Sequence, residues 1–159
     1  MDLAQFWPLF LFLHVMGAIL AFGPTFAYSI MGSMAGKEPQ HANFSSRQVE
    51  AIGNKLVYPL AIFQGVTGVL IILSISYPVF SSPWLLLGIT LYAITLGYAL
   101  FPQRTAVHHL IELTSTPPAP GSPPSPEIAA TVKRIQRGGI FLSVMIVVIV
   151  FLMVVKPGA

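Results

Sequence analysis

Long apolar stretches, separated by short polar connections, dominate this chain. The apolar stretches cover about residues 6–31, 56–76, 84–101 and 138–155. The second and third share one uncharged reach between Lys55 and Arg104, which a turn-like cluster with two prolines at residues 77–83 divides. A helix needs roughly 20 apolar residues to cross about 30 Å of hydrocarbon. The pattern therefore predicts four membrane spans.

Continuous apolar character indicates helices, because the strands of a membrane barrel would alternate polar and apolar residues. We therefore predict an all-α membrane protein, a single four-transmembrane-helix bundle over residues 1–159. The first span has no basic residue before it and is longer than the apolar core of a signal peptide, so we interpret it as a retained helix.

The polar connections also carry helix signals, which predict helical extensions beyond the membrane. Ser125-Pro126-Glu127 has the residues of a helix start, with serine as N-cap, proline at the first helical position and an acid in the first turn. Ser45, followed three residues later by Gln48, resembles a capping box. A proline-rich connector is predicted at residues 114–126; the alternative is a recognition site for a proline-binding module.

Composition and charge fit this class and give an orientation. Hydrophobic residues make up 55% of the chain and charged residues 8%, against about 25% charged in soluble proteins. The basic residues lie mainly in the first and third connections, which the positive-inside rule places in the cytoplasm. This predicts an N-out, C-out topology. The net charge of +3 follows from this asymmetry and does not indicate a nucleic-acid partner.

One ionisable side chain, His14, lies well within an apolar span. Such residues are costly in a membrane and are functional candidates by default. A neutral imidazole is a good axial ligand for haem iron, and Gly17 one turn away leaves space for a flat group. Met145 lies at a similar depth, so it is a candidate second axial ligand. The alternative is a lipid-facing or core methionine.

The alternative for His14 is a structural hydrogen bond to a neighbouring helix, with Gln64, Thr67 or Tyr92 as the acceptor or donor. Elsewhere, His108 and His109 are candidates for a metal or an anionic headgroup. Adjacent histidines of a helix point about 100° apart and rarely bind one ion, so a solvated helix face is the expected reading. Zero cysteines exclude disulfides, thiol catalysis and iron–sulfur ligation by this chain.

Several blocks resemble the HemJ-type protoporphyrinogen oxidases and a sibling group of uncharacterised bacterial integral membrane proteins. These blocks are Phe12-Leu13-His14-Val15-Met16-Gly17-Ala18-Ile19, Asn54-Lys55-Leu56-Val57-Tyr58-Pro59-Leu60-Ala61-Ile62 leading to Thr67-Gly68, and Val154-Val155-Lys156-Pro157. The resemblance implies a four-helix bundle in the bacterial cytoplasmic membrane that binds haem b, with His14 at the family's haem-associated position. Those oxidases carry a lysine on the third helix after a tryptophan, whereas this chain has Trp84-Leu85-Leu86-Leu87-Gly88, which argues against oxidase activity.

Two classes of function follow. The first is a haem b-binding protein of membrane redox chemistry or haem handling, with His14, Gly17 and Met145 at the cofactor and His14 on its metal. The second is a non-catalytic accessory subunit whose helices and proline-rich connector pack against other membrane subunits or a second copy. The lipid bilayer is a partner in both.

Overall fold

The computed structural model describes residues 3–116 and 123–158, and over these residues it contains helices and no strand. The helical elements are α1 (Trp7–Lys37), α2 (Ala42–Ile52), α3 (Tyr58–Ser74), α4 (Pro83–Tyr98), α5 (Arg104–Leu113) and α6 (Pro126–Val155), with short 3₁₀ turns at Leu3–Phe6, Pro39–His41 and Val79–Ser81. Part of the predicted proline-rich connector, residues 117–122, lies outside the described residues.

Within the described residues, four continuous helical paths are long and apolar enough to cross a membrane. They run over Leu3–Lys37, Pro39–Ser74, Pro83–Leu113 and Pro126–Val155. The predicted all-α, four-helix membrane bundle is confirmed. Its N-out, C-out orientation stays a prediction, which rests on the positive-inside rule.

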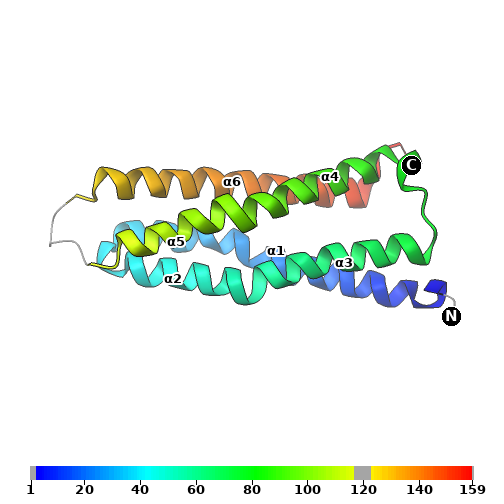
Figure 1. The fold of residues 1–159 in the computed structure, drawn as a ribbon, viewed down its shortest axis with the longest axis horizontal. Coiled ribbons are helices and arrows are strands. Elements are labelled where there is room, and N and C mark those ends of the chain that lie inside the picture. The colour runs from blue at the N-terminus through cyan, green and yellow to red at the C-terminus, as the bar shows by residue number, and fades with distance from the viewer. Residues whose placement is uncertain (1–2, 117–122, 159) are drawn as a thin grey trace.

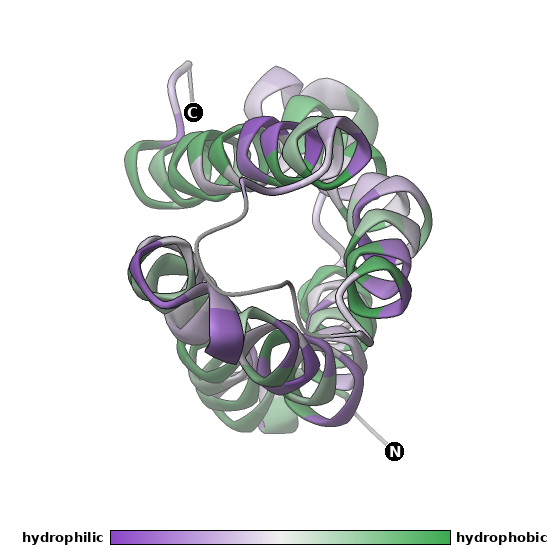
Figure 2. Ribbon diagram, turned by 90° about the vertical axis from the view of Figure 1, so that its left-hand side faces the viewer, coloured by the Kyte–Doolittle hydropathy of each residue, from purple (hydrophilic) through white to green (hydrophobic). Residues whose placement is uncertain are grey.

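Helix pairs organise the bundle (Figure 1). α1 packs along α3, and α4 packs along α6, but the backbones of α3 and α4 stay apart although these helices follow each other in the chain. At the other end, α2 packs on α5 and α1, and α5 packs on α6. Viewed along the bundle from that end, the helices surround a common axis and their near turns carry the hydrophilic residues (Figure 2). The bundle is thus closed at the α2–α5 end and splayed where α3 faces α4.

Two π-helical turns, Gly53–Val57 and Ala99–Gln103, join α2 to α3 and α4 to α5. In each, an amide bonds five residues back: Tyr58 N–H to the Gly53 carbonyl, and Arg104 N–H to the Ala99 carbonyl. Pro59 follows the first turn and Pro102 lies inside the second. Proline lacks an amide proton and its ring clashes with the carbonyl four residues before it. The wider turn relieves that clash, so both helical paths continue past their prolines.

Of the two predicted helix starts, one is confirmed and the other is wrong. Ser125 caps α6 as expected: its hydroxyl accepts a bond from the Ile128 amide at 3.2 Å. The capping box at Ser45 is wrong, because α2 already begins at Ala42, after the turn Pro39–His41. Ser45 lies inside α2, where its hydroxyl donates to the Met31 carbonyl of α1 at 3.4 Å. A tertiary acceptor on another helix thus engages the side chain that the local pattern assigned to a cap.

Candidate functional site

His14 lies on the side of α1 that packs against α3. Its Nδ1 is 2.9 Å from the hydroxyl oxygen of Thr67, which is 1% exposed. The imidazole itself is half-buried. Of the three hydrogen-bond partners that the sequence left open, the structure selects Thr67.

The hydrogen bond from the Thr67 hydroxyl to the α3 backbone fixes the direction of the hydrogen bond between Thr67 and His14. This hydroxyl lies 3.1 Å from the carbonyl oxygens of both Phe63 and Gln64, and carbonyls only accept. The single hydroxyl proton is therefore committed to the α3 backbone, and the oxygen accepts the proton of Nδ1–H. This tautomer leaves the lone pair on Nε2 of His14, the atom able to bind a metal.

Nε2 of His14 also keeps access to its surroundings. Among the described residues, the fully buried side-chain polar atoms without a hydrogen-bond partner are Tyr28 Oη, Gln64 Oε1 and Trp84 Nε1. Nε2 is not one of them, and no side-chain hydrogen bond between described residues engages it; the backbone of Gln64 is a further hydrogen-bond partner of the ring. The open edge of the ring is therefore the Nε2 edge.

The glycines beside this histidine serve the contact between α1 and α3. A Cβ on Gly68 would lie 3.3 Å from Cε1 of His14, so Gly68 lets the ring approach α3 closely. A Cβ on Gly17 would lie 2.8 Å from Gln64 Oε1 and 3.4 Å from the Phe63 ring. The space that the sequence assigned to a flat ligand at Gly17 is filled by these two side chains. A planar group has to approach at the Nε2 edge instead.

Gln64 makes a tertiary contact that the sequence pattern did not predict. It is 7% exposed, and its Oε1 is buried against Gly17 without a hydrogen-bond partner. Gln64 precedes Thr67 by three positions, about one helical turn, so both side chains lie on the α1 side of α3. An amide inside an otherwise apolar helix was the sequence signal for this position. His14, Thr67 and Gln64 together form the polar part of the α1–α3 contact.

Met145 lies on α6 and is half-buried. None of the described hydrogen bonds or ring contacts joins it to His14. Over the described residues, moreover, no group of three or more His, Cys, Asp or Glu side chains could hold a metal ion. Any metal at this site would therefore have His14 as its anchor and would take most of its ligands from elsewhere.

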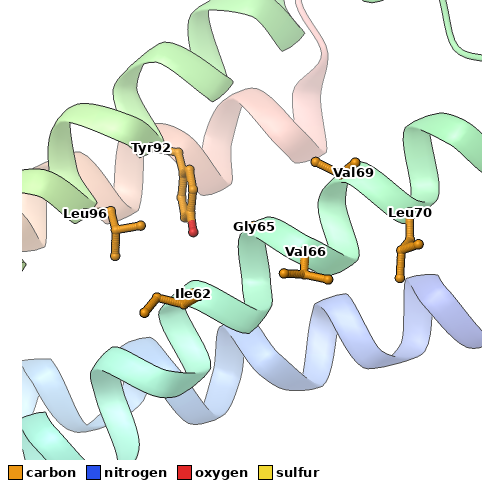
Figure 3. Close-up of a pocket in the computed structure, with 7 residues that line it drawn as sticks. All are labelled: Ile62, Gly65, Val66, Val69, Leu70, Tyr92 and Leu96. Carbon is orange, nitrogen blue, oxygen red and sulfur yellow. The ribbon is translucent and has the colours of Figure 1, made fainter.

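A second feature lies on the opposite side of α3 (Figure 3). A cavity of about 350 Å³ is lined by Ile62, Gly65, Val66, Val69, Leu70, Tyr92 and Leu96. Tyr92 reaches from α4 toward α3, and its hydroxyl donates to the Ala61 carbonyl at 2.6 Å. Gly65 makes this approach possible, since a Cβ there would lie 2.7 Å from that hydroxyl. At 100° per residue, the cavity residues and the His14-facing residues fall on different faces of α3, so the cavity does not belong to the His14 site.

His108 and His109 pair with carboxylates at the closed end of the bundle. His108 Nδ1 lies 2.8 Å from Glu50, and His109 Nε2 lies 3.3 Å from Glu127. Glu112 approaches both rings, at 3.6 and 3.5 Å. Both histidines are exposed, so these contacts connect α2, α5 and α6 across an exposed face. Among the described residues, no group of three or more His, Cys, Asp or Glu side chains that could hold a metal ion lies there.

Comparison with known proteins gives a family. A model described as "Predicted integral membrane protein (DUF2269)" matches residues 8–157. The chain belongs to this family. No curated protein and no solved structure matches it. The family match, together with the four long apolar helices, indicates a multi-pass integral membrane protein, and the comparisons give no link to the HemJ-type oxidases.

Proposed function

We propose that this member of the DUF2269 family binds haem b, which Nε2 of His14 would hold through the iron, and acts in membrane redox chemistry or haem handling. The observation that carries the proposal is the bond from Nδ1–H of His14 to Thr67. Metal-binding histidines almost always donate their second ring N–H in this way, which orients the ring and raises the basicity of the ligating nitrogen.

The residues fit a haem better than a bare ion. A zinc site needs three or four protein ligands, whereas the porphyrin brings four nitrogens and takes one or two axial ligands from the protein. His14 supplies one imidazole, with Nε2 available, in the apolar contact between α1 and α3, and one such ligand is sufficient for a haem. Bound haem would supply one-electron chemistry. His14 would hold it, Thr67 would keep the proton on Nδ1, and Met145 is the proposed second ligand from α6.

An absorption spectrum of the protein, purified in detergent from cells supplied with haem, tests this directly. We expect a Soret band that disappears in His14→Ala. His108→Ala and His109→Ala are matched controls, because these exposed histidines lie at the closed end and should leave the band unchanged. Absence of the band from the wild-type protein, or its persistence in His14→Ala, would refute haem binding at this site.

Substitutions at Thr67 and Met145 test separately how these two residues contribute to haem binding. Thr67→Val should retain a Soret band with about 10–100-fold weaker haem affinity, the usual cost of losing the group that orients a ligating histidine. Met145→Leu should change the spectrum of the bound haem if Met145 also holds the iron, whereas Met153→Leu on the same helix should not. Identical spectra for wild type and Met145→Leu would remove Met145 from the proposal and leave His14 in place.

The splay between α3 and α4 supports the second candidate, an accessory subunit. The cavity there is apolar, and its one hydroxyl, on Tyr92, is already bonded to Ala61. An apolar segment of another membrane subunit would cover this cavity and leave no buried polar group without a hydrogen-bond partner. Purification from native membranes in mild detergent tests this candidate. A chain that migrates alone at its monomer mass would count against it.

A further inference from the structure

Three exposed basic side chains lie at one level of the bundle, on three different helical paths. About 20 residues of helix, or roughly 30 Å, span the hydrocarbon. We count this length from the ends of α3, α4 and α6 that lie away from α2 and α5. On the α3 path the count ends at Lys55. On the α4 path it ends two residues before Arg104, and on α6 it ends one residue beyond Arg137. By this count, each of these cations lies within two residues of the predicted edge of the hydrocarbon.

Side-chain contacts connect the three paths at this level. Cζ of Arg104 lies 5.9 Å from the centre of the Tyr58 ring, and Lys55 precedes Tyr58 by three residues, about one helical turn. The neighbouring Gln103 donates from Nε2 to a backbone carbonyl of α6, two residues before Arg137, at 3.1 Å. We call Lys55, Arg104 and Arg137 the basic layer.

The chain itself does not neutralise the basic layer. All four described carboxylates have histidines as their partners, namely Glu38 with His41, Glu50 with His108, Glu112 with His108 and His109, and Glu127 with His109. Over residues 3–116 and 123–158, no lysine or arginine forms an ion pair with a carboxylate. Glu50 and Arg104 both act electrostatically on Tyr58, but the Glu50 carboxylate is already held by His108 at 2.8 Å.

We propose that the basic layer binds the phosphate-bearing headgroup of an acidic phospholipid in the adjacent leaflet. Exposed cations at the hydrocarbon edge meet lipid phosphates at the depth where these reside, and the guanidinium fork matches phosphate geometry. The charge that the layer presents is positive and unpaired, so a neutral zwitterionic lipid complements it less well than a lipid with net negative charge. A bound lipid of this kind would bridge α3, α5 and α6.

The test uses the full chain in nanodiscs of phosphatidylcholine, with and without phosphatidylglycerol. Native mass spectrometry counts the retained lipid, and thermal unfolding reports its effect on stability. Near an anionic surface each Lys or Arg contributes about fivefold in affinity. We expect the wild type to retain phosphatidylglycerol preferentially. Each single change to glutamine in the basic layer should lower the preference about fivefold, and the triple variant about a hundredfold.

Lys156→Gln, at the opposite end of the bundle, is the matched control and should keep the preference. Arg104→Lys keeps the charge and should keep most of it. Should the triple variant fail to fold, the single variants carry the test. Equal retention of the two lipids by the wild type, or equal loss in Lys156→Gln and in the basic-layer variants, overturns the proposal. The proposal is also overturned if soluble glycerol phosphate raises the unfolding temperature as much as the lipid does. A soluble anion would then be sufficient for binding, and the lipid would not be required.

Discussion

The bond between His14 and Thr67 offers the sharpest test of the site. In Thr67→Val, a methyl group replaces the hydroxyl at almost constant volume, and Nδ1–H of His14 loses its acceptor. A hydrogen bond contributes about 0.5–1.5 kcal/mol net, and such bonds average about 0.6 kcal/mol inside membranes. Thr67 is 1% exposed, so water cannot easily replace the lost partner. We expect Thr67→Val to lower the free energy of unfolding by about 1 kcal/mol.

A double-mutant cycle with His14→Ala separates the bond from packing. Without the imidazole, the Thr67 hydroxyl bonds only to its own helix, through the carbonyls of Phe63 and Gln64. Thr67→Val should then cost little, leaving a coupling energy of about 0.5–1.5 kcal/mol. Unfolding in mixed micelles, followed by circular dichroism in the absence of haem, measures all four proteins. Equal costs of Thr67→Val with and without His14 would show that the two side chains do not bond and that this bond does not place the lone pair of the imidazole on Nε2.

Two further changes test the helix contacts. In Gly138→Ala, a Cβ would overlap Oε1 of Gln103 and break the bond from Gln103 to α6, so unfolding free energy should fall by about 1–3 kcal/mol; Gly139→Ala, which meets open space, should be neutral or slightly stabilising in the same thermal unfolding assay. Ser125→Ala removes the side chain that accepts from the Ile128 amide and should cost about 1 kcal/mol, and an unchanged unfolding temperature would show that this cap does not stabilise α6.

Part of the candidate site was accessible from the sequence and part was not. An ionisable residue in an apolar span identified His14, because the cost of burying it is a property of the residue and its immediate neighbours. Its hydrogen-bond partner depended on how the antiparallel helices α1 and α3 are aligned. In the observed register His14 faces Thr67 and Gly17 faces Gln64. A shift of one turn would exchange these partners without changing the hydropathy pattern.

The two predicted serine caps, of which only Ser125 is confirmed, illustrate the same division. Ser125 follows a proline-rich stretch and starts a helix with only local bonds, so the local pattern was sufficient. Ser45 has an equally plausible pattern, but its hydroxyl reaches the Met31 carbonyl on a neighbouring helix. A capping motif counts only bonds within its own turn. It therefore cannot anticipate an acceptor that tertiary packing provides.

The sequence by itself determined the membrane class, the helical spans and the concentration of basic residues in two connections. These depend on hydrocarbon thickness and on the residues of one segment at a time. Only the tertiary structure decided that α1 pairs with α3 and α4 with α6, that α3 and α4 splay around Tyr92, and that Gln64 fills the space at Gly17. It also brought Lys55, Arg104 and Arg137 to one level. Steric fit between side chains of different helices sets these features, and no single segment encodes that fit.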